Sequence, residues 1–302
     1  MGEQDWLAEQ FESHRARLRA VAYRMLGSLT EADDAVQETW LRLSRAGADG
    51  IGNLGGWLTT AAGRICLDML RARAVRREEP LGVHLPDPVV SSPDSVNGSG
   101  PEQEAVLADS VGLALLVVLD RLTPPERLAL VLHDMFAVPF DQIAPIVGRS
   151  PDAAKMLASR ARPRVRGAAP ASGTDLGRQW EIVRAFRAAA QAGDFDGLLA
   201  VLDPDVVLRF DTSALRPMTV FRGVSAVARG AASYARRDHV HVQVLVNGAP
   251  GAVALEQGRP VAVAAFTIRA ERIAAMDILA DPHRLARLDL AFLATDEAAG
   301  AK

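Results

Sequence analysis

The first half of the chain has apolar residues at the three- and four-residue spacing that is typical of amphipathic α-helices. One run comprises Leu18, Val21, Ala22, Met25 and Leu26, and the next comprises Ala32, Ala35, Val36, Thr39, Trp40 and Leu43. Thr30 followed by Asp33 resembles a capping box and predicts the start of the second helix. A third helix is predicted from about Gly55 to Arg77. This segment is therefore expected to be all helix.

The middle of the chain carries start and stop signals for three further helices. Thr123-Pro124-Pro125-Glu126 predicts a capped helix start, and a shorter helix is expected over Pro139–Val147. Gly148-Arg149 predicts a tight turn before Ser150-Pro151, which begins a last helix that we expect to end at Pro163. Two helices around a glycine-containing turn form a helix-turn-helix arrangement.

The last segment changes period and predicts an α+β domain. Two helical stretches are expected, Asp175–Gln191 and Val224–Arg237. Alternating patterns then predict a meander of strands: His239–Val246, Gly251–Leu255, Pro260–Ile268 and Ile273–Leu279. Asn247-Gly248 is the turn between the first two strands.

Two stretches rich in Pro, Gly, Ser and Asp, Glu78–Pro101 and Gly167–Gly173, divide the 302-residue chain. We expect a first domain over residues 1–78, a linker over 79–104, a second domain over 105–168 and a third over 169–302. No apolar run is long enough to cross a bilayer and no signal peptide is recognisable, so the sequence predicts a cytoplasmic protein. Cys66, a single cysteine on an apolar helix face, is expected in the core.

Charge is distributed unevenly although the net charge is only −3. Residues 148–166 contain six basic residues and one acidic residue, whereas residues 31–38 contain four acids and no base. This separation predicts two surfaces with partners of opposite charge.

The last helix of the middle segment is the first candidate surface for DNA. An apolar stripe runs along it, formed by Ala154, Leu157, Ala158, Ala161 and Val165. Lys155, Ser159 and Arg162 lie on the opposite face, where the second helix of a helix-turn-helix reads base edges in the major groove. Phosphate contacts are expected from Arg160, Arg164 and Arg166, and Arg149 is a further DNA-binding candidate. A solvated amphipathic helix is the alternative.

Two other helices carry contrasting charge. Glu31, Asp34 and Glu38 share one face of the second helix, with Asp33 and Gln37 beside them, and this face suits a basic protein partner or solvent. The third helix instead carries Trp57 near its start and the cations Arg64, Arg71, Arg73, Arg76 and Arg77. Aromatic and cationic side chains together suit unstacked DNA, although core packing is the alternative for Trp57.

Four stretches resemble extracytoplasmic-function (ECF) sigma factors of RNA polymerase, over about Phe11–Arg166. They are LGSLTEADDAVQETWLRL, GWLTTAAGRICLDMLRARAVRR, LTPPERLALVLHDMF and IAPIVGRSPDAAKMLASRARPRVR. The resemblance implies that Asp33, Asp34, Gln37 and Glu38 bind core RNA polymerase. It implies that the Gly55–Arg77 helix recognises and melts the minus-ten promoter element. The helix beginning at Ser150 would read the minus-thirty-five element.

The last segment resembles SnoaL-like domains of the nuclear-transport-factor-2 superfamily, which are cone-shaped α+β folds that usually enclose a cavity. Sigma factors of the sigma-J-type subgroup carry this fusion. The stretches that match the subgroup's motifs are His84-Leu85-Pro86, Asp211-Thr212-Ser213-Ala214, Leu245-Val246-Asn247-Gly248 and Asp281-Pro282-His283-Arg284-Leu285. The resemblance makes Asp211, Asn247, Gly248, Asp281 and Pro282 candidate regulatory residues, and the cavity a candidate site for a small ligand.

The leading hypothesis is a non-enzymatic sigma factor whose activity is set by contact between the C-terminal domain and the sigma domains. The alternative is a one-component, ligand-responsive regulator with a helix-turn-helix. An enzyme would need a cavity acid such as Asp211 or Asp277 working with Tyr234, His239 or His241, and the spacing of these residues does not single out a catalytic set. No cofactor or metal is predicted, because His239 and His241 have no identifiable third ligand.

Overall fold

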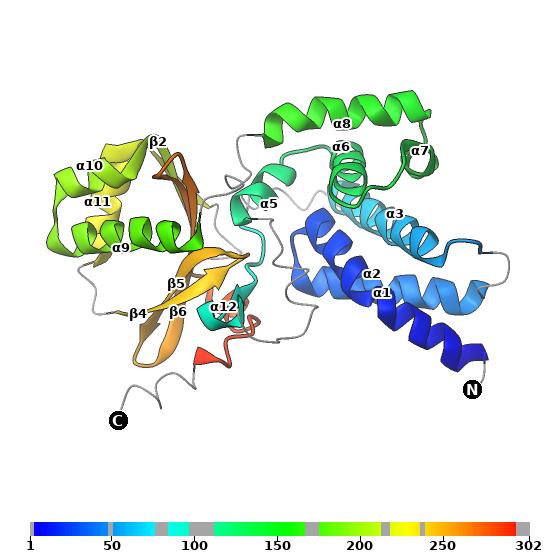
Figure 1. Ribbon diagram of the computed structural model, residues 1–302, viewed down its shortest axis with the longest axis horizontal. Coiled ribbons are helices and arrows are strands. Elements are labelled where there is room, and N and C mark those ends of the chain that lie inside the picture. Colours follow the sequence, from blue (N-terminus) through cyan, green and yellow to red (C-terminus); the bar gives the residue numbers. More distant parts are fainter. Residues whose placement is uncertain are drawn as a thin grey trace. The chain divides into compact units, whose positions relative to one another are not determined.

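The structure is a computed structural model that describes residues 3–47, 51–75, 84–96, 112–166, 175–212, 218–235 and 239–293. The chain divides into two compact units (Figure 1). The N-terminal unit comprises residues 1–79, 101–107 and 115–168, and the C-terminal unit comprises residues 80–100, 108–114 and 169–302. The segment between the two predicted helical domains is divided between the two units. Its described residues 84–96 belong to the C-terminal unit.

Three helices begin the N-terminal unit: α1 (Glu3–Leu26), α2 (Leu29–Ala46) and α3 (Leu54–Val75). They bury a common core that includes Phe11, Leu18, Val36 and Leu58. Cys66 is fully buried, as expected for a core residue.

The capping box expected at Thr30 and Asp33 is wrong. Gly27, at φ 71°, ends α1, and Ser28 is already the N-cap of α2. Because the connection between the two helices is so short, Thr30 lies inside the first turn of α2, where it cannot cap the helix.

The second helical group follows residue 112. Its elements are α5 (Leu113–Leu119), α6 (Pro124–Leu130), the π-helical turn η2 (Val131–Met135), α7 (Phe140–Val147) and α8 (Pro151–Val165). The capping box at Thr123 is confirmed, because its backbone N–H donates to the Glu126 carboxylate at 3.1 Å. Gly148 adopts a left-handed conformation with φ 68° in the turn between α7 and α8, and the Ser150 side chain caps α8.

The expectation that α8 ends at Pro163 is wrong, since the helix continues to Val165. Pro163 has no N–H to donate to the Ser159 carbonyl, so the helix loses one hydrogen bond there without ending. The N–H of Arg166 still closes that turn on the Arg162 carbonyl at 3.0 Å.

The C-terminal unit is a seven-stranded sheet with helices, as the α+β prediction requires. The strands are β1 (Val90–Ser91), β2 (Leu202–Asp211), β3 (Thr219–Arg222), β4 (Val240–Val246), β5 (Ala249–Glu256), β6 (Arg259–Arg269) and β7 (Arg272–Leu279). Their order is β1-β4-β5-β6-β7-β2-β3, and β2 runs parallel to β7 while all other neighbours are antiparallel. The predicted four-strand meander is confirmed as β4 to β7.

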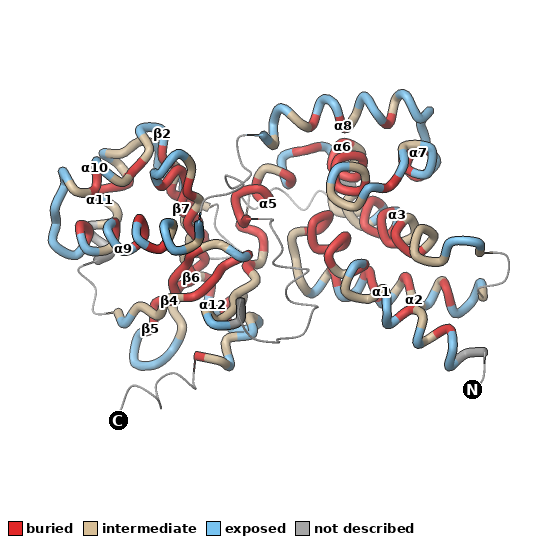
Figure 2. Tube along the Cα trace, in the orientation of Figure 1, coloured by how far each residue is buried: buried red, intermediate tan, exposed pale blue. Residues whose placement is uncertain are grey.

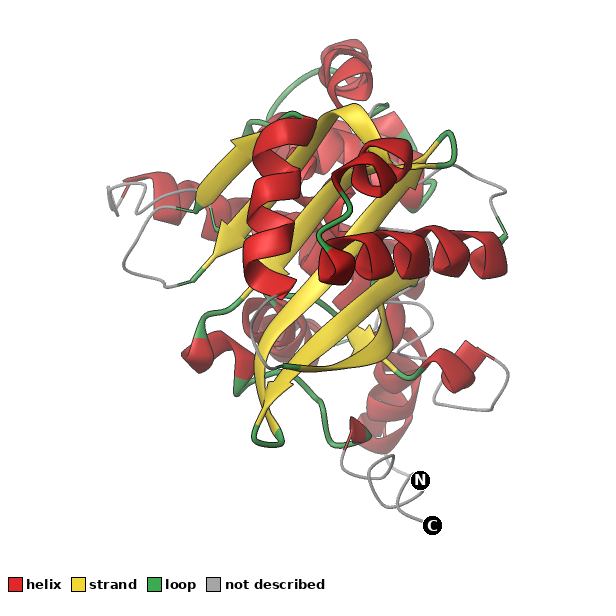
Figure 3. Cartoon of the chain, turned by 90° about the vertical axis from the view of Figure 1, so that its left-hand side faces the viewer, coloured by secondary structure: helices red, strands yellow, loops and turns green. Residues whose placement is uncertain are grey.

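Helices α9 (Leu176–Ala192), α10 (Phe195–Val201) and α11 (Val224–Ala235) cover one face of the sheet (Figure 3). A 3₁₀ turn, η1 (Pro93–Val96), follows β1, and the short α12 (Pro282–Leu285) follows β7. The main core of this unit lies between the sheet and the three covering helices, with Val183, Leu198, Val206 and Ile273 among its buried members. Figure 2 shows the same distribution, with buried positions on the inward helix faces and along the strands. Within the described part of the chain, no helix is long and apolar enough to cross a membrane.

Candidate functional site

The acidic face of α2 consists of Asp33, Asp34, Gln37 and Glu38. The first three are exposed and Glu38 is half-buried. Ala35, Val36 and other residues on the opposite side of α2 are buried and fix the orientation of this face. Asp33 pairs with Arg19 at 2.6 Å and Glu38 with Arg42 at 3.0 Å, and all four of these side chains remain partly accessible to solvent. Salt bridges at such accessible sites contribute little stability, so a partner's cations can replace Arg19 and Arg42 beside these carboxylates.

The predicted minus-ten residues on α3 fall into three groups. Arg64 and Arg71 are exposed. Arg73 is half-buried and forms an ion pair with Glu31 of α2, so it also joins two helices. Arg76 and Arg77 lie outside the described residues.

Trp57 lies between the helical core and a surface pocket. It is half-buried and packs against the core of α1, α2 and α3. It also lines a surface pocket of about 320 Å³ together with Asn53, Gly56, Thr60 and Gln142. The pocket combines an indole with amide and hydroxyl groups, which suits a stacked base better than an anion.

The outward face of α8 carries the predicted minus-thirty-five residues. Ala154, Ala158 and Ala161 are buried, which turns the polar side outward as the apolar stripe predicted. Lys155, Ser159, Arg160 and Arg166 are exposed, and so is Arg149 in the turn before the helix.

Two arginines of α8 have ion-pair partners that the sequence pattern did not indicate. Arg162 makes a bidentate pair with Asp134 at 2.7 and 2.8 Å, and these hydrogen bonds raise the pKa of Arg162 above its ordinary value. Arg164 pairs with Glu126, the capping residue of α6, at 3.0 Å. These two side chains brace α8 against the elements before it, so less of their charge is available to DNA than the spacing suggests.

In the C-terminal unit, Asp211 is the centre of a buried polar site at the end of β2. Its side chain is 1% exposed. One carboxylate oxygen accepts the backbone N–H of Leu85 at 2.9 Å and a guanidinium N–H of Arg284 at 2.9 Å, and the other lies 3.3 Å from His84 Nδ1. Leu85 and His84 belong to the segment that connects the two helical groups, so this segment is fastened to the sheet.

Arg284 of α12 is the second part of this site, and it lies outside the two charged segments of the sequence, residues 31–38 and 148–166. Its guanidinium donates to Asp211, to the Leu85 carbonyl at 2.6 Å and to the Asp87 carboxylate at 2.6 and 3.1 Å. Asp281 is buried and caps α12 by accepting the N–H groups of His283 and Arg284 at 2.8 and 3.2 Å. The cap holds Arg284 in position, and Pro282 begins the helix.

Asn247 fastens the same segment a few residues further along. Its side-chain oxygen accepts the N–H of Val89 at 3.1 Å, and its own backbone N–H donates to the Val89 carbonyl at 2.8 Å. Asn247 and Gly248 both have positive φ, 50° and 74°, as a type I′ hairpin turn requires. From there Val90–Ser91 continues as β1 on the edge of the sheet beside β4. We call residues 84–91 the docked linker.

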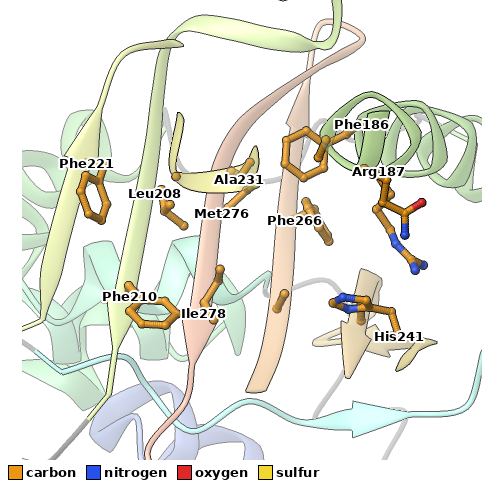
Figure 4. A pocket seen from close by; sticks show the side chains of 15 residues that line it. Phe186, Arg187, Leu208, Phe210, Phe221, Ala231, His241, Phe266, Met276 and Ile278 are labelled. Atoms are coloured by element: carbon orange, nitrogen blue, oxygen red, sulfur yellow. The ribbon is translucent and has the colours of Figure 1, made fainter. Parts of the chain in front are cut away.

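A separate pocket opens between α9, α11 and the sheet face that these helices cover (Figure 4). Its volume is about 290 Å³. Phe186, Phe210, Phe266 and Met276 form much of its wall, and Arg187 and His241 lie together on one side.

Of the candidate catalytic residues, His241 alone is among the described residues that line this pocket. Asp211 holds the docked linker, and Asp277 is a fully buried partner of Arg209 at 2.6 Å. Burial raises the pKa of Asp277 despite that partner. No acidic residue is among the described residues that line the pocket, and the side chain of Tyr234 is outside the described part. The described residues also contain no cluster of three or more potential metal ligands.

Comparison with protein families assigns the two helical groups. Residues 10–76 match sigma-70 region 2 and residues 112–165 match sigma-70 region 4. The presence of both regions favours a sigma factor over a one-component regulator, which would need only the helix-turn-helix.

Relatives with a similar chain extend the match through the C-terminal unit. The ECF RNA polymerase sigma factor SigJ of Mycobacterium tuberculosis (strain H37Rv) is 38% identical over 91% of this chain and 92% of its own length. The probable ECF RNA polymerase sigma factor SigI of the same species is 35% identical over 94% and 97% of the two chains. The crystal structure of Mycobacterium tuberculosis SigJ superposes with a TM-score of 0.72 at 32% identity, covering 94% of this chain and 99% of that one. The chain therefore belongs to the ECF RNA polymerase sigma factors.

Proposed function

We propose that the C-terminal domain of this sigma factor controls promoter-specific initiation by holding the docked linker. The linker connects region 2 to region 4, and both regions must be positioned for one promoter. A domain that binds the connection can favour an inactive arrangement without covering either DNA-binding surface. The contacts made by Asp211, Asn247 and Arg284 to residues 84–91 carry this proposal.

The polymerase-binding part of the proposal rests on α2. Asp33, Asp34 and Gln37 are exposed and Glu38 is accessible at the edge of the same face, so a basic surface of core RNA polymerase could contact all four. Opposite charges would steer that encounter and make it sensitive to salt.

The promoter-binding part rests on α3 and α8. Arg64 and Arg71 are exposed, and we expect them to hold phosphates while the pocket at Trp57 receives a base from the melted minus-ten element. On α8, Lys155, Ser159 and Arg160 are the exposed residues with which we expect the minus-thirty-five element to be read.

The energy required for control is modest. Keeping 99% of the molecules in an inactive arrangement takes about 2.7 kcal/mol of preference. The docked linker offers several charge-assisted hydrogen bonds at largely buried groups, each typically contributing about 1.5–3 kcal/mol. Core polymerase or another signal would need to offset only part of this sum.

Run-off transcription with purified core polymerase tests the proposal, on a promoter obtained by selecting genomic fragments. Asp211→Asn removes the charge that binds Arg284, and it is expected to raise the transcript yield above that of the unmodified protein. Asp205→Asn changes an exposed carboxylate on the same strand and serves as the control. Equal yields from Asp211→Asn and Asp205→Asn would reject control through the linker.

A further inference from the structure

The pocket of the C-terminal domain has the dimensions and lining of a small-molecule site. At about 290 Å³ it is at the lower end of the roughly 300–1,000 Å³ typical of such sites. Leu208 of β2 and Phe266 of β6 are both register partners of Met276 of β7, so the three residues lie side by side across the sheet. Helix α9, which covers this face of the sheet, supplies Phe186. These side chains present a largely apolar surface to whatever enters.

Among the described residues that line the pocket, Arg187, Gln191 and His241 are the ones with polar side chains. Arg187 extends from α9 and His241 from β4, and the two side chains approach each other at the pocket wall (Figure 4). Burial lowers the pKa of Arg187. Burial, and next the charge of Arg187, lowers the pKa of His241, which favours the neutral imidazole with one N–H to donate.

No described carboxylate neutralises Arg187. The salt bridges of the described residues do not include it, and the residues that line the pocket with it contain no Asp or Glu. Glu256, at the end of β5, lies 3.9 Å from His239. An anion bound in the cavity would therefore stabilise this half-buried guanidinium by pairing with its charge.

We propose that this cavity binds a small apolar molecule with a single carboxylate, whose oxygens pair with the Arg187 guanidinium and accept an N–H from His241. The planar fork of an arginine matches a carboxylate in bidentate geometry, and the aromatic and aliphatic walls receive the rest of the molecule. The net charge of the pocket falls from positive to neutral on binding. This binding is independent of whether the docked linker controls transcription.

Calorimetric titration of the full chain tests the assignment with two probes of different shape, 2-naphthoate and octanoate. Their uncharged counterparts, 2-naphthamide and octanamide, measure what the carboxylate adds. We expect at least one carboxylate to bind, and its amide to bind about tenfold or more weakly, because a charge-assisted pair is lost. Equal affinity for acid and amide would overturn the anionic assignment, and no heat from either acid at millimolar concentration would overturn the site.

Three variants locate the binding. Arg187→Gln is expected to weaken carboxylate binding about tenfold or more, whereas Arg184→Gln, an exposed arginine on the same helix, should leave it unchanged. Ala231→Phe fills the cavity from α11 and should abolish binding, with far-ultraviolet circular dichroism used to check that the chain remains folded. Binding that persists in Ala231→Phe, or equal losses in Arg187→Gln and Arg184→Gln, would reject this cavity as the site.

Discussion

Replacing Arg284 with alanine removes the side chain that, among the described residues, makes the largest number of hydrogen bonds to the docked linker and Asp211 together, and so tests linker docking. The side chain is 16% exposed and joins three parts of the docked linker site: the Asp211 carboxylate, the Asp87 carboxylate and the Leu85 carbonyl. Removal leaves Asp211 nearly fully buried, with the Leu85 N–H and His84 as its remaining partners. Loss of the cation destabilises the docked state, because the buried carboxylate keeps its charge and water cannot reach it to take the place of the arginine.

The expected size of the effect follows from that geometry. Removing one partner of a buried ion pair costs about 3–5 kcal/mol, and the lower value applies here because Asp87 is partly solvated. A loss of about 3 kcal/mol corresponds to a shift of about 100-fold in the equilibrium between docked and released linker. We therefore expect the amide of Leu85, which is hydrogen-bonded to Asp211 when docked, to lose about 100-fold of its protection against hydrogen exchange.

Hydrogen exchange followed by mass spectrometry measures this change at the linker and at the sheet in the same sample. Arg287→Ala, an exposed arginine just after α12, is the matched control and should leave the Leu85 amide protected. Amides of the central strands β5 and β6 should stay protected in both variants, which shows that the domain remains folded. Unchanged protection of Leu85 in Arg284→Ala, with the sheet intact, would refute the reasoning.

Three further predictions concern the fold. Burial raises the pKa of Cys66 to about 12, so a thiol reagent at pH 8 should label the native protein far more slowly than the protein in denaturant; equal rates would contradict its burial. Arg209→Met should reduce the free energy of unfolding, measured in urea, by about 3–5 kcal/mol, because it leaves the buried Asp277 unpaired. The double variant with Asp277→Leu should lose less unfolding free energy than the sum of the losses in the two single variants, and additive losses would argue against a coupled pair. Gly148→Ala should reduce stability by about 1 kcal/mol because φ is 68° there, and an unchanged thermal midpoint would contradict that conformation.

Most of the architecture follows from local pattern. The β4–β7 meander and the helices of the N-terminal unit other than α5 were predictable because their periodicity is regular and their turns carry Asn-Gly, Gly or capping residues. β2 was missed because Asp203, Pro204 and Asp205 interrupt its alternation, and because its pairing with β7 is parallel and distant in sequence. The two-residue β1 is defined only by its partner β4, so no local pattern could reveal it.

The candidate sites were predictable by residue type and less so by partner. Charge runs located the faces of α2 and α8, but they could not show that Asp134 engages Arg162, since that contact joins residues 28 positions apart. Motif resemblance indicated Asp211 and Asn247, whereas the role of Arg284 depends on a carbonyl and a carboxylate about 200 positions earlier in the chain. Arg187 lies on an ordinary amphipathic helix, and its position beside His241 becomes visible only when the sheet is assembled.

The most direct test of control through the linker is to fasten the linker covalently and measure transcription. Val90 of β1 and Val246 of β4 are opposite each other in the ladder, so their Cα atoms are expected at a separation that a disulfide can span. The natural Cys66 is buried and should not compete. With the Val90→Cys/Val246→Cys variant and core polymerase, run-off transcript should be nearly absent under oxidising conditions and should return on reduction. The transcript yield of each single-cysteine variant should be the same under oxidising and reducing conditions. Full transcription from the oxidised, verified disulfide form would contradict the claim that release of the docked linker is required.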